Sequence, residues 1–304
     1  MDCIRQPTLL FFADGEVVSG MGHLRRCEGL ASAAKERGWN CIFIDTGPQA
    51  SAWLRERGWS VVTQESLSDA VSAIVLDSYI ITDERIAKLK MLSKNLVYFH
   101  DSGVPIADFS LVVSSADGSD KMPNGTRVLS GGQYRIIHPN ILAVPKSLRR
   151  TPVENIIVTF GAAPAMIDFG TIISQRLQKE FPSVAVRLIY GLSGTDAAHA
   201  FGQADIAVSG GGQSMLELSY LGVPTVAVIL SPDQSGQVRD AASRGAVSEV
   251  GKRGDQGIVD SIVKAVQELY SVEVRSDMST AAQAYIDGRG AQRILDGIAA
   301  IIRA

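Results

Sequence analysis

Short apolar, β-branched runs alternate along the chain with amphipathic segments, and this alternation most restricts the fold. The run Thr8–Ala13 is followed by an amphipathic segment, Gly22–Arg37, and then by a second run, Asn40–Ile44. Gly38 and Gly58 stand where the C-caps of helices are expected. Strands that alternate with helices are typical of βαβ units on a parallel sheet, so the sequence predicts an α/β protein.

The alternation occurs in two series, without any repeated sequence. In the first, strands are predicted at Thr8–Ala13, Asn40–Ile44, Ala73–Leu76, Asn95–Phe99 and Leu111–Val113, and helices near Gly22–Arg37, Gln49–Arg57 and Asp83–Leu92. In the second, strands are predicted at Asn155–Phe160, Ala185–Ile189, Ile206–Val208 and Thr225–Ile229, and helices near Ile167–Glu180, Gln213–Leu221 and Gln234–Arg244. The sequence thus predicts two doubly wound domains that face a cleft at the carboxyl ends of their strands.

A proline-bearing stretch, Ile137–Val153, separates the two series and is predicted to be an exposed connection. We place the domains at residues 1–145 and 146–304. The basic cluster Lys146–Arg150 is either a functional patch or, as we prefer, a solvated linker. Further helices are predicted at Gly257–Tyr270, Ser279–Ile286 and Ala291–Ile302, and the closing helix could pack on either domain.

Composition excludes several classes of protein. The chain has 304 residues, of which 46% are hydrophobic, so it can bury a large core. The 29 Lys and Arg against 32 Asp and Glu give a net charge of −3, which disfavours nucleic acid as a partner. The apolar runs found are far shorter than the roughly 20 residues that span a bilayer, and the N-terminus lacks a signal pattern. We therefore expect a cytoplasmic protein without a membrane span.

Cysteine and histidine patterns give no support for a metal site. The 3 cysteines, Cys3, Cys27 and Cys41, form no CxxC pair and are expected to be small core residues or inert thiols. The 4 histidines have no zinc-motif spacing, and no D-x-D triplet is present to chelate a divalent ion. No metal and no cofactor are expected.

A glycine-bearing loop that begins at Asp14 and includes Gly20 and Gly22 leads from the first predicted strand into a helix. Glycines allow a ligand to approach the backbone, and the N–H groups of a helix start favour anions such as phosphate. His23 would lie in the first helical turn, where the helix dipole disfavours imidazolium and so keeps a neutral base available. His23 is either such a base or a polar residue at the helix start. Arg25 replaces the last glycine of G-x-G-x-x-G, which argues against an ordinary dinucleotide fold.

A second strand–glycine–helix segment, Ser209–Leu218, suits a nucleotide. The backbone N–H groups of Gly211, Gly212, Gln213 and Ser214 could hold a diphosphate. One turn later, the Glu217 carboxylate could accept hydrogen bonds from two ribose hydroxyls. The alternative for Glu217 is a first-turn acid that the helix dipole favours.

Three further polar segments follow predicted strands. In Leu230–Gln237, the amides of Gln234 and Gln237 could bind a base, phosphate or sugar, whereas Asp233 either joins them or caps the next helix. The other two, Asp77-Ser78-Tyr79 and His100-Asp101-Ser102, are turn residues or line the predicted cleft.

These loops, together with ordered signatures along most of the chain, resemble a known enzyme family. The signatures are Ala13-Asp14-Gly15, Gly20-Met21-Gly22-His23 with Arg26-Cys27 and Leu30-Ala31, Asp77-Ser78-Tyr79, Leu129–Pro139, and Ser209–Glu217. They are similar to the glycosyltransferase-B architecture of two Rossmann-like domains, and most of all to its offshoot, the UDP-2,4-diacetamido-2,4,6-trideoxy-β-L-altropyranose hydrolases of pseudaminic acid (a sialic-acid-like sugar) biosynthesis.

The resemblance implies roles for particular residues. It implies that His23 activates a water molecule, without a metal ion, to attack the anomeric carbon. The reaction would release UDP and invert the anomeric configuration. The resemblance also implies that Tyr79 is an active-site tyrosine. Ser214 and Glu217 match nucleotide contacts, and Gln234 matches the glutamine of an Asn-Gln pair. The remaining candidate substrate- or nucleotide-binding residues are Asp14, Gly20, Gly22, Arg26, Tyr134, Gly161, Gly211, Gly212, Gln213 and Gln237.

The chain departs from the family pattern at a few positions. Phe12 and His138 stand where the family has arginine, Asp233 stands where it has asparagine, and Gly161–Pro164 replaces a glycine-rich segment with an acid. Loss of arginines would weaken contacts to an anion without removing the base. If the family's arginines contact the ligand, these departures make a changed sugar or nucleotide an alternative to the family's substrate.

The resulting hypothesis is a monomeric nucleotide-sugar hydrolase that acts on a UDP-diacetamido-trideoxyhexose. Its first alternative is a glycosyltransferase of the same fold, in which His23 deprotonates an acceptor hydroxyl in place of water. Its second is a nucleotide-sugar binding protein without catalysis. Release of nucleotide in the absence of an acceptor would distinguish the hydrolase from both.

Overall fold

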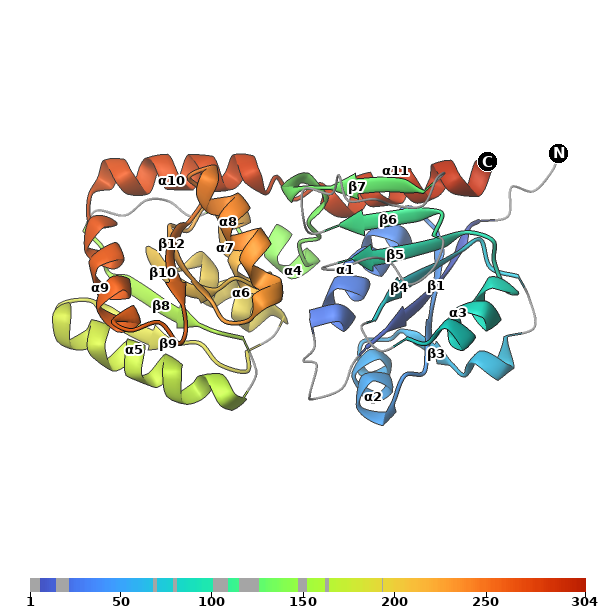
Figure 1. The fold of residues 1–304 in the computed structure, drawn as a ribbon, viewed down its shortest axis with the longest axis horizontal. Helices are drawn as coiled ribbons and strands as arrows, with labels where there is room; N and C mark the ends of the chain where they lie inside the picture. The colour runs from blue at the N-terminus through green and yellow to red at the C-terminus, as the bar shows by residue number, and fades with distance from the viewer. Residues whose placement is uncertain are drawn as a thin grey trace. The chain divides into compact units, whose positions relative to one another are not determined.

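The computed structural model of the chain divides into two units. It describes residues 6–14, 22–67, 70–78, 81–100, 109–114, 126–146, 152–161, 164–192 and 194–304. Unit 1 comprises Met1–Ile136 with Arg289–Ala304, and unit 2 comprises Ile137–Gly288. Each unit has its own sheet (Figure 1). Each also has its own apolar clusters.

Unit 1 contains a parallel seven-stranded sheet with the order β3-β2-β1-β4-β5-β6-β7. Its strands are β1 (Thr8–Ala13), β2 (Asn40–Ile44), β3 (Ser60–Val62), β4 (Ala73–Asp77), β5 (Leu96–His100), β6 (Leu111–Ser114) and β7 (Arg127–Ser130). Its helices are α1 (Gly22–Glu36), α2 (Pro48–Glu56), α3 (Asp83–Lys90) and α11 (Gly290–Arg303), with the short 3-10 turns η1 (Gln64–Ser66) and η2 (Gly132–Tyr134). The strand order reverses direction between β1 and β4, as in doubly wound folds.

Helices cover both faces of this sheet. One face packs against α1, α2 and α11, which contribute among others Leu30, Leu54 and Ile294 to a single buried cluster. The other face packs against α3 through Ile86 and Leu89. Burial on both faces explains why β4 and β5 are continuous apolar runs that end in a polar residue.

Unit 2 contains a parallel five-stranded sheet with the order β12-β11-β10-β8-β9. Its strands are β8 (Asn155–Thr159), β9 (Ala185–Leu188), β10 (Ile206–Gly210), β11 (Thr225–Ile229) and β12 (Ser248–Lys252). Its helices are α4 (Pro139–Leu142), α5 (Ile167–Glu180), α6 (Gly194–Gly202), α7 (Gln213–Leu221), α8 (Ser235–Ser243), α9 (Ile258–Glu268) and α10 (Val272–Tyr285), with η3 (Pro164–Met166) and η4 (Pro232–Gln234). Apolar clusters place α6, α7, α8 and α10 on one face of this sheet and α5 and α9 on the other.

Most predicted elements are present with their ends within a few residues. Thr8–Ala13, Asn40–Ile44 and Thr225–Ile229 are strands as predicted, and Gly38 and Gly58 have the positive φ of helix ends. The sequence interpretation missed β3, β7, β12 and α6, and also α4, which lies in the stretch predicted to be an exposed connection. Helix α10 begins at Val272, seven residues before the predicted start at Ser279. In the part of the chain that the structure describes, no helix is long and apolar enough to cross a membrane.

The division into units differs from the predicted domains in two ways. The boundary lies after Ile136 rather than after residue 145, because Ile137 and Ile141 belong to the apolar cluster of unit 2. The closing helix α11 joins unit 1, where it packs against α1, β6 and η2. Gly290 makes this possible, since a Cβ there would collide with the backbone of Arg135.

Candidate active site

The point where the strand order of unit 1 reverses carries a cluster of polar side chains. Strands β1 and β4 are neighbours, with Ala13 paired to Asp77, and the Asp14 amide donates to the Asp77 carbonyl at 3.1 Å. In open α/β sheets the carboxyl end of the strands at such a reversal is where ligands bind. Asp14 and Asp77 are both buried there.

Helix α1 brings three further side chains to this point. Leu24, Leu30 and Ala31 recur at helical spacing and are buried in the cluster beneath the helix, which fixes its rotation. Positions three and four residues apart share a helix face, so His23 lies beside Arg26 and Cys27. His23 is only 7% exposed.

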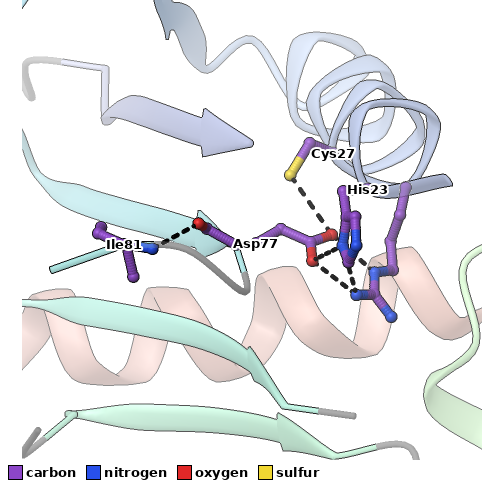
Figure 2. A network of polar contacts seen from close by, with 6 residues as sticks. His23, Cys27, Asp77 and Ile81 are labelled. Atoms are coloured by element: carbon purple, nitrogen blue, oxygen red, sulfur yellow. Dashed lines mark hydrogen bonds and ion pairs between the residues drawn. The ribbon is translucent and has the colours of Figure 1, made fainter. Parts of the chain in front are cut away.

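The Asp77 carboxylate is the centre of a hydrogen-bonded network (Figure 2). Its Oδ1 lies 2.6 Å from His23 Nδ1 and accepts from Arg26 Nη2 at 2.6 Å. Its Oδ2 accepts from Arg26 Nε at 2.7 Å, and the Cys27 thiol donates to the same oxygen at 3.9 Å. Asp77 therefore binds the Arg26 guanidinium through both oxygens while it contacts the imidazole of His23.

This geometry fixes which nitrogen of His23 can act as a base. A carboxylate can only accept hydrogen bonds, so Nδ1 carries the proton that points to Asp77. In the neutral ring, Nε2 is then the nitrogen with a lone pair. An imidazole oriented by a buried carboxylate is the arrangement that general-base catalysis uses in hydrolases.

Two opposing influences act on the charge of His23. The dipole disfavours imidazolium at a helix start, but the adjacent Asp77 carboxylate favours it. Sequence reasoning marked Asp77 as a polar strand end and as part of a family signature, but it missed the contact of Asp77 with His23. The available signal was a carboxylate that directly follows a buried strand.

Other candidates in unit 1 have different surroundings. Tyr134 lies in η2 and packs against the apolar cluster that α1 and α11 share. Gly22 is exposed, with open space where a Cβ would lie. Gly20 and Tyr79 lie outside the described residues, as do most of the Asp14–Gly22 loop and the basic cluster after Lys146.

In unit 2, the strand order reverses between β8 and β10. Gly161 follows β8, is exposed and has a φ of +82°. Gly211 and Gly212 follow β10 and lead into α7, whose N-cap position, Gly212, makes no side-chain cap. Helix starts have backbone N–H groups without a partner in the helix, so the first turn of α7 is suited to an anion.

Gln234 and Gln237 support the loop after β10. Gln234 Oε1 accepts from the Gly211 amide at 3.1 Å and from the Leu230 amide at 3.2 Å, so it joins the loops after β10 and β11. Gln237 Nε2 donates to the Gly211 carbonyl at 2.7 Å. Gly211 has no room for a Cβ, which would collide with Val238 on α8. Direct contact of either glutamine with a ligand stays a prediction.

The first turn of α7 presents three polar side chains. Gln213, Ser214 and Glu217 are all partly exposed, and Gln213 Nε2 donates to Glu217 Oε1 at 3.3 Å. This bond holds the Glu217 carboxylate against the helix start. Their roles as nucleotide contacts stay predictions.

Two of the departures from the family pattern, Phe12 and His138, have structural roles. A third, Asp233, does not cap the next helix, which was one of its two predicted roles. The Phe12 ring belongs to the apolar cluster under α3 and has the Arg85 guanidinium 5.3 Å from its centre. His138 is the N-cap of α4, where its Nδ1 accepts from the Asn140 amide at 3.3 Å. Asp233 is exposed in η4, and the N-cap of α8 is Gln234 instead. Among the described residues, no cluster of three His, Cys, Asp or Glu side chains could hold a metal ion.

A curated protein is similar to this chain over most of its length. No protein-family model matches the chain. Spore coat polysaccharide biosynthesis protein SpsG of Bacillus subtilis (strain 168) is 22% identical over 93% of this chain and 95% of its own.

Solved structures extend the comparison. LpCGTa in complex with UDP has a TM-score of 0.69 at 14% identity, over 98% of this chain and all of its own. MurG of Acinetobacter baumannii has a TM-score of 0.68 at 12% identity, over 96% of this chain and 99% of its own. The chain thus has the glycosyltransferase-B fold of two Rossmann-like domains, as its sequence predicts.

Proposed function

We propose that this protein is an enzyme that acts on a nucleotide sugar, with His23 as its general base. One observation carries the proposal. His23 Nδ1 lies 2.6 Å from a carboxylate that is 1% exposed, at the strand-order reversal of unit 1. Such a contact orients the imidazole and leaves Nε2 to take a proton from a hydroxyl or a water molecule.

The nucleotide belongs to unit 2 in this proposal. The uncapped start of α7 would bind the diphosphate through its backbone N–H groups, and Glu217 would accept from the ribose hydroxyls. The fold shared with LpCGTa, which was solved with UDP, and with SsfS6, which was solved with thymidine diphosphate, supports a nucleoside diphosphate. Gln234 and Gln237 would keep the Gly211 backbone in place for this contact.

Hydrolysis is the form of the reaction that the sequence signatures favour. A water oxygen attacks the anomeric carbon while its proton passes to His23 Nε2. The bond from that carbon to the diphosphate oxygen breaks, and its electron pair leaves with UDP. Helix N–H groups stabilise the charge that grows on the diphosphate, so one base suffices. A single displacement inverts the anomeric configuration.

Glycosyl transfer is the second candidate, and the comparisons favour it. Several solved structures that share the fold are named glycosyltransferases, among them CalG4, the calicheamicin glycosyltransferase. SpsG is named for polysaccharide biosynthesis. In this form His23 would deprotonate an acceptor hydroxyl, with the same departure of UDP.

The test measures UDP release from UDP-2,4-diacetamido-trideoxyhexose by the wild type, His23→Ala and His199→Ala. His199 is an exposed histidine on α6 and serves as the matched control. For a hydrolase, we expect release without acceptor by the wild type and the control, and a loss of about 10²- to 10⁴-fold in His23→Ala.

The outcomes separate the candidates. UDP release that requires an added sugar or lipid hydroxyl would show that the reaction is glycosyl transfer rather than hydrolysis. Equal rates for the wild type and His23→Ala would refute His23 as the base. Binding of the sugar nucleotide without any turnover would leave only a binding protein.

A further inference from the structure

We infer that Arg26 is a positioning residue that fixes the Asp77 carboxylate and, by its own charge beside the imidazole, keeps His23 neutral, and therefore basic at Nε2, near neutral pH. This inference rests on the proposed role of His23 as a base. It assigns Arg26 to the support of that base, whereas the sequence interpretation placed Arg26 among the substrate contacts.

The contacts of Arg26 carry the inference. Its Nε and Nη2 donate to the two oxygens of Asp77 at 2.7 and 2.6 Å, a bidentate pairing that fixes the carboxylate plane. Its guanidinium carbon lies 4.8 Å from the centre of the Phe99 ring, so the group is also held from the side of β5. Side-chain exposure is 18% for Arg26 and 1% for Asp77.

Charge explains why the base needs this arginine. A buried carboxylate that contacted His23 alone would favour the imidazolium form, which has no lone pair for catalysis. Arg26 Nη2 lies only 3.5 Å from His23 Nδ1, so a proton on Nε2 would place a second positive charge beside the first. Asp77 can then orient the ring while Arg26 supplies the compensating charge.

Other described groups also lie close to the contact between His23 and Asp77. On α1, the Cys27 thiol donates to Asp77. Burial, and then the negative charge of Asp77, raise the pKa of this thiol, so the thiol stays neutral. At the end of β1, the buried Asp14 is adjacent to Asp77 through its backbone. On β5, the residue that faces the network is the apolar Phe99. Arg26 is thus the cation that ion-pairs with Asp77 in the part of the network that the structure describes.

The direct test is a ¹H–¹³C NMR titration of the His23 ring in the intact protein without substrate. The chain has 4 histidines, so the His23 signal is assigned by its loss in His23→Gln. The variants are Arg26→Gln, Arg26→Lys and the control Arg25→Gln, which alters the neighbouring arginine on the same helix. Removal of the Arg26 charge should raise the titration midpoint by roughly one pH unit or more. Arg26→Lys, which keeps the charge, and Arg25→Gln should stay close to the wild type.

A second pair of variants covers the case in which Arg26→Gln does not fold because Asp77 is left unpaired. Asp77→Asn removes the carboxylate, and Asp77→Asn combined with Arg26→Gln removes both charges. We expect the double variant to have a higher His23 midpoint than Asp77→Asn alone. Equal midpoints in that pair, or in wild type and Arg26→Gln, would overturn the inference.

Catalysis gives an independent readout. The acid limb of the pH profile of kcat/KM should move to higher pH in Arg26→Gln and stay in place in Arg26→Lys. A rise in KM with an unchanged acid limb would instead indicate that Arg26 contacts the substrate, as the sequence interpretation had it. If the NMR midpoint moves as expected but the wild type turns over no sugar nucleotide, the proposed function fails and the role of Arg26 in setting the state of His23 remains.

Discussion

At the scale of single residues, the buried Asp77 carboxylate organises the candidate active site. It is 1% exposed, and its oxygens contact an imidazole, a guanidinium and a thiol. Loss of a partner from a buried ion pair leaves an uncompensated charge, which costs about 3–5 kcal/mol. This cluster is therefore sensitive to changes that alter its charge.

The first prediction concerns Asp77→Asn. An amide in place of the carboxylate can donate to Nδ1 and thereby stabilise the wrong tautomer of His23. We expect kcat/KM for UDP release to fall by about 10³- to 10⁴-fold, by analogy with the same change in a Ser-His-Asp triad. The matched control is Asp83→Asn, an exposed acid in the first turn of α3, which should retain full activity. Wild-type rates in a folded Asp77→Asn would refute the role of this contact.

The second prediction concerns the cysteines. Burial raises the pKa of the Cys27 thiol well above its usual range and that of Cys41 to about 12. The thiolate is the reactive form, so neither should be alkylated by iodoacetamide at pH 8 in the folded protein. Peptide mass spectrometry after labelling, with and without urea, measures this. Labelling of Cys27 or Cys41 at the rate of a free thiol would contradict their burial.

Residue-scale prediction from the sequence reached His23 but not its partner. Glycines, a strand end and a helix start mark His23 by local pattern alone. The contact with Asp77 depends on β1 and β4 being neighbours, although β2 and β3 lie between them in the chain. A strand order is a property of the sheet, so spacing along the chain could not identify this pair.

At the scale of elements, the loops that follow the strands are held by close packing. The turn from β10 into α7 lies against α8, where Val238 occupies the space that a side chain at Gly211 would need. The amides of Gln234 and Gln237 hold the same turn by hydrogen bonds to the Gly211 backbone. The position of the α7 start thus depends on its neighbour α8.

The third prediction tests this dependence with Gly211→Ala. The added methyl group would push the loop away from α8 and misplace the helix start, so we expect UDP affinity to fall at least tenfold, which is about 1.4 kcal/mol. Gly236→Ala is the control, because no atom lies within 4 Å of its Cβ position. Isothermal titration with UDP measures both. Unchanged affinity in Gly211→Ala would show that this turn does not hold the nucleotide.

The strands that the sequence failed to predict share a physical reason. Strands β3 and β12 lie at sheet edges and consist mostly of partly exposed residues, as does β7, so their apolar signal is weak. Central strands such as β4 and β11 are buried throughout and are marked by continuous apolar runs. Periodicity also predicted α11 but could not tell which unit its apolar face would cover.

At the scale of the whole molecule, the chain leaves unit 1 and returns to it. Residues 137–288 form unit 2, and α11 then supplies Ala291, Ile294, Leu295 and Ile298 to the core of unit 1. Each fully buried Leu or Ile contributes about 1.5–3 kcal/mol, and a domain is stable by only about 5–15 kcal/mol. Unit 1 therefore depends on this helix.

The fourth prediction is that deletion of residues 289–304 unfolds unit 1 and leaves unit 2 folded. Calorimetry and limited proteolysis should show one remaining transition and a protected fragment that begins near Ile137. Deletion of the exposed Arg303 and Ala304 alone is the control and should leave both units intact. If residues 6–136 in the longer deletion were protected from proteolysis as well as they are in the full chain, unit 1 would not depend on α11.

The return of α11 also sets an order of events during translation. Domains commonly fold as they leave the ribosome, the N-terminal one first. Here the part of the chain made first cannot complete its core until residues 290–298 emerge, after all of unit 2 has been synthesised. A ribosome that stalls within unit 2 would carry a nascent unit 1 with Leu111 and Leu129, which face Gly297 on α11, uncovered. We expect chaperones to bind the uncovered apolar side chains of such a chain.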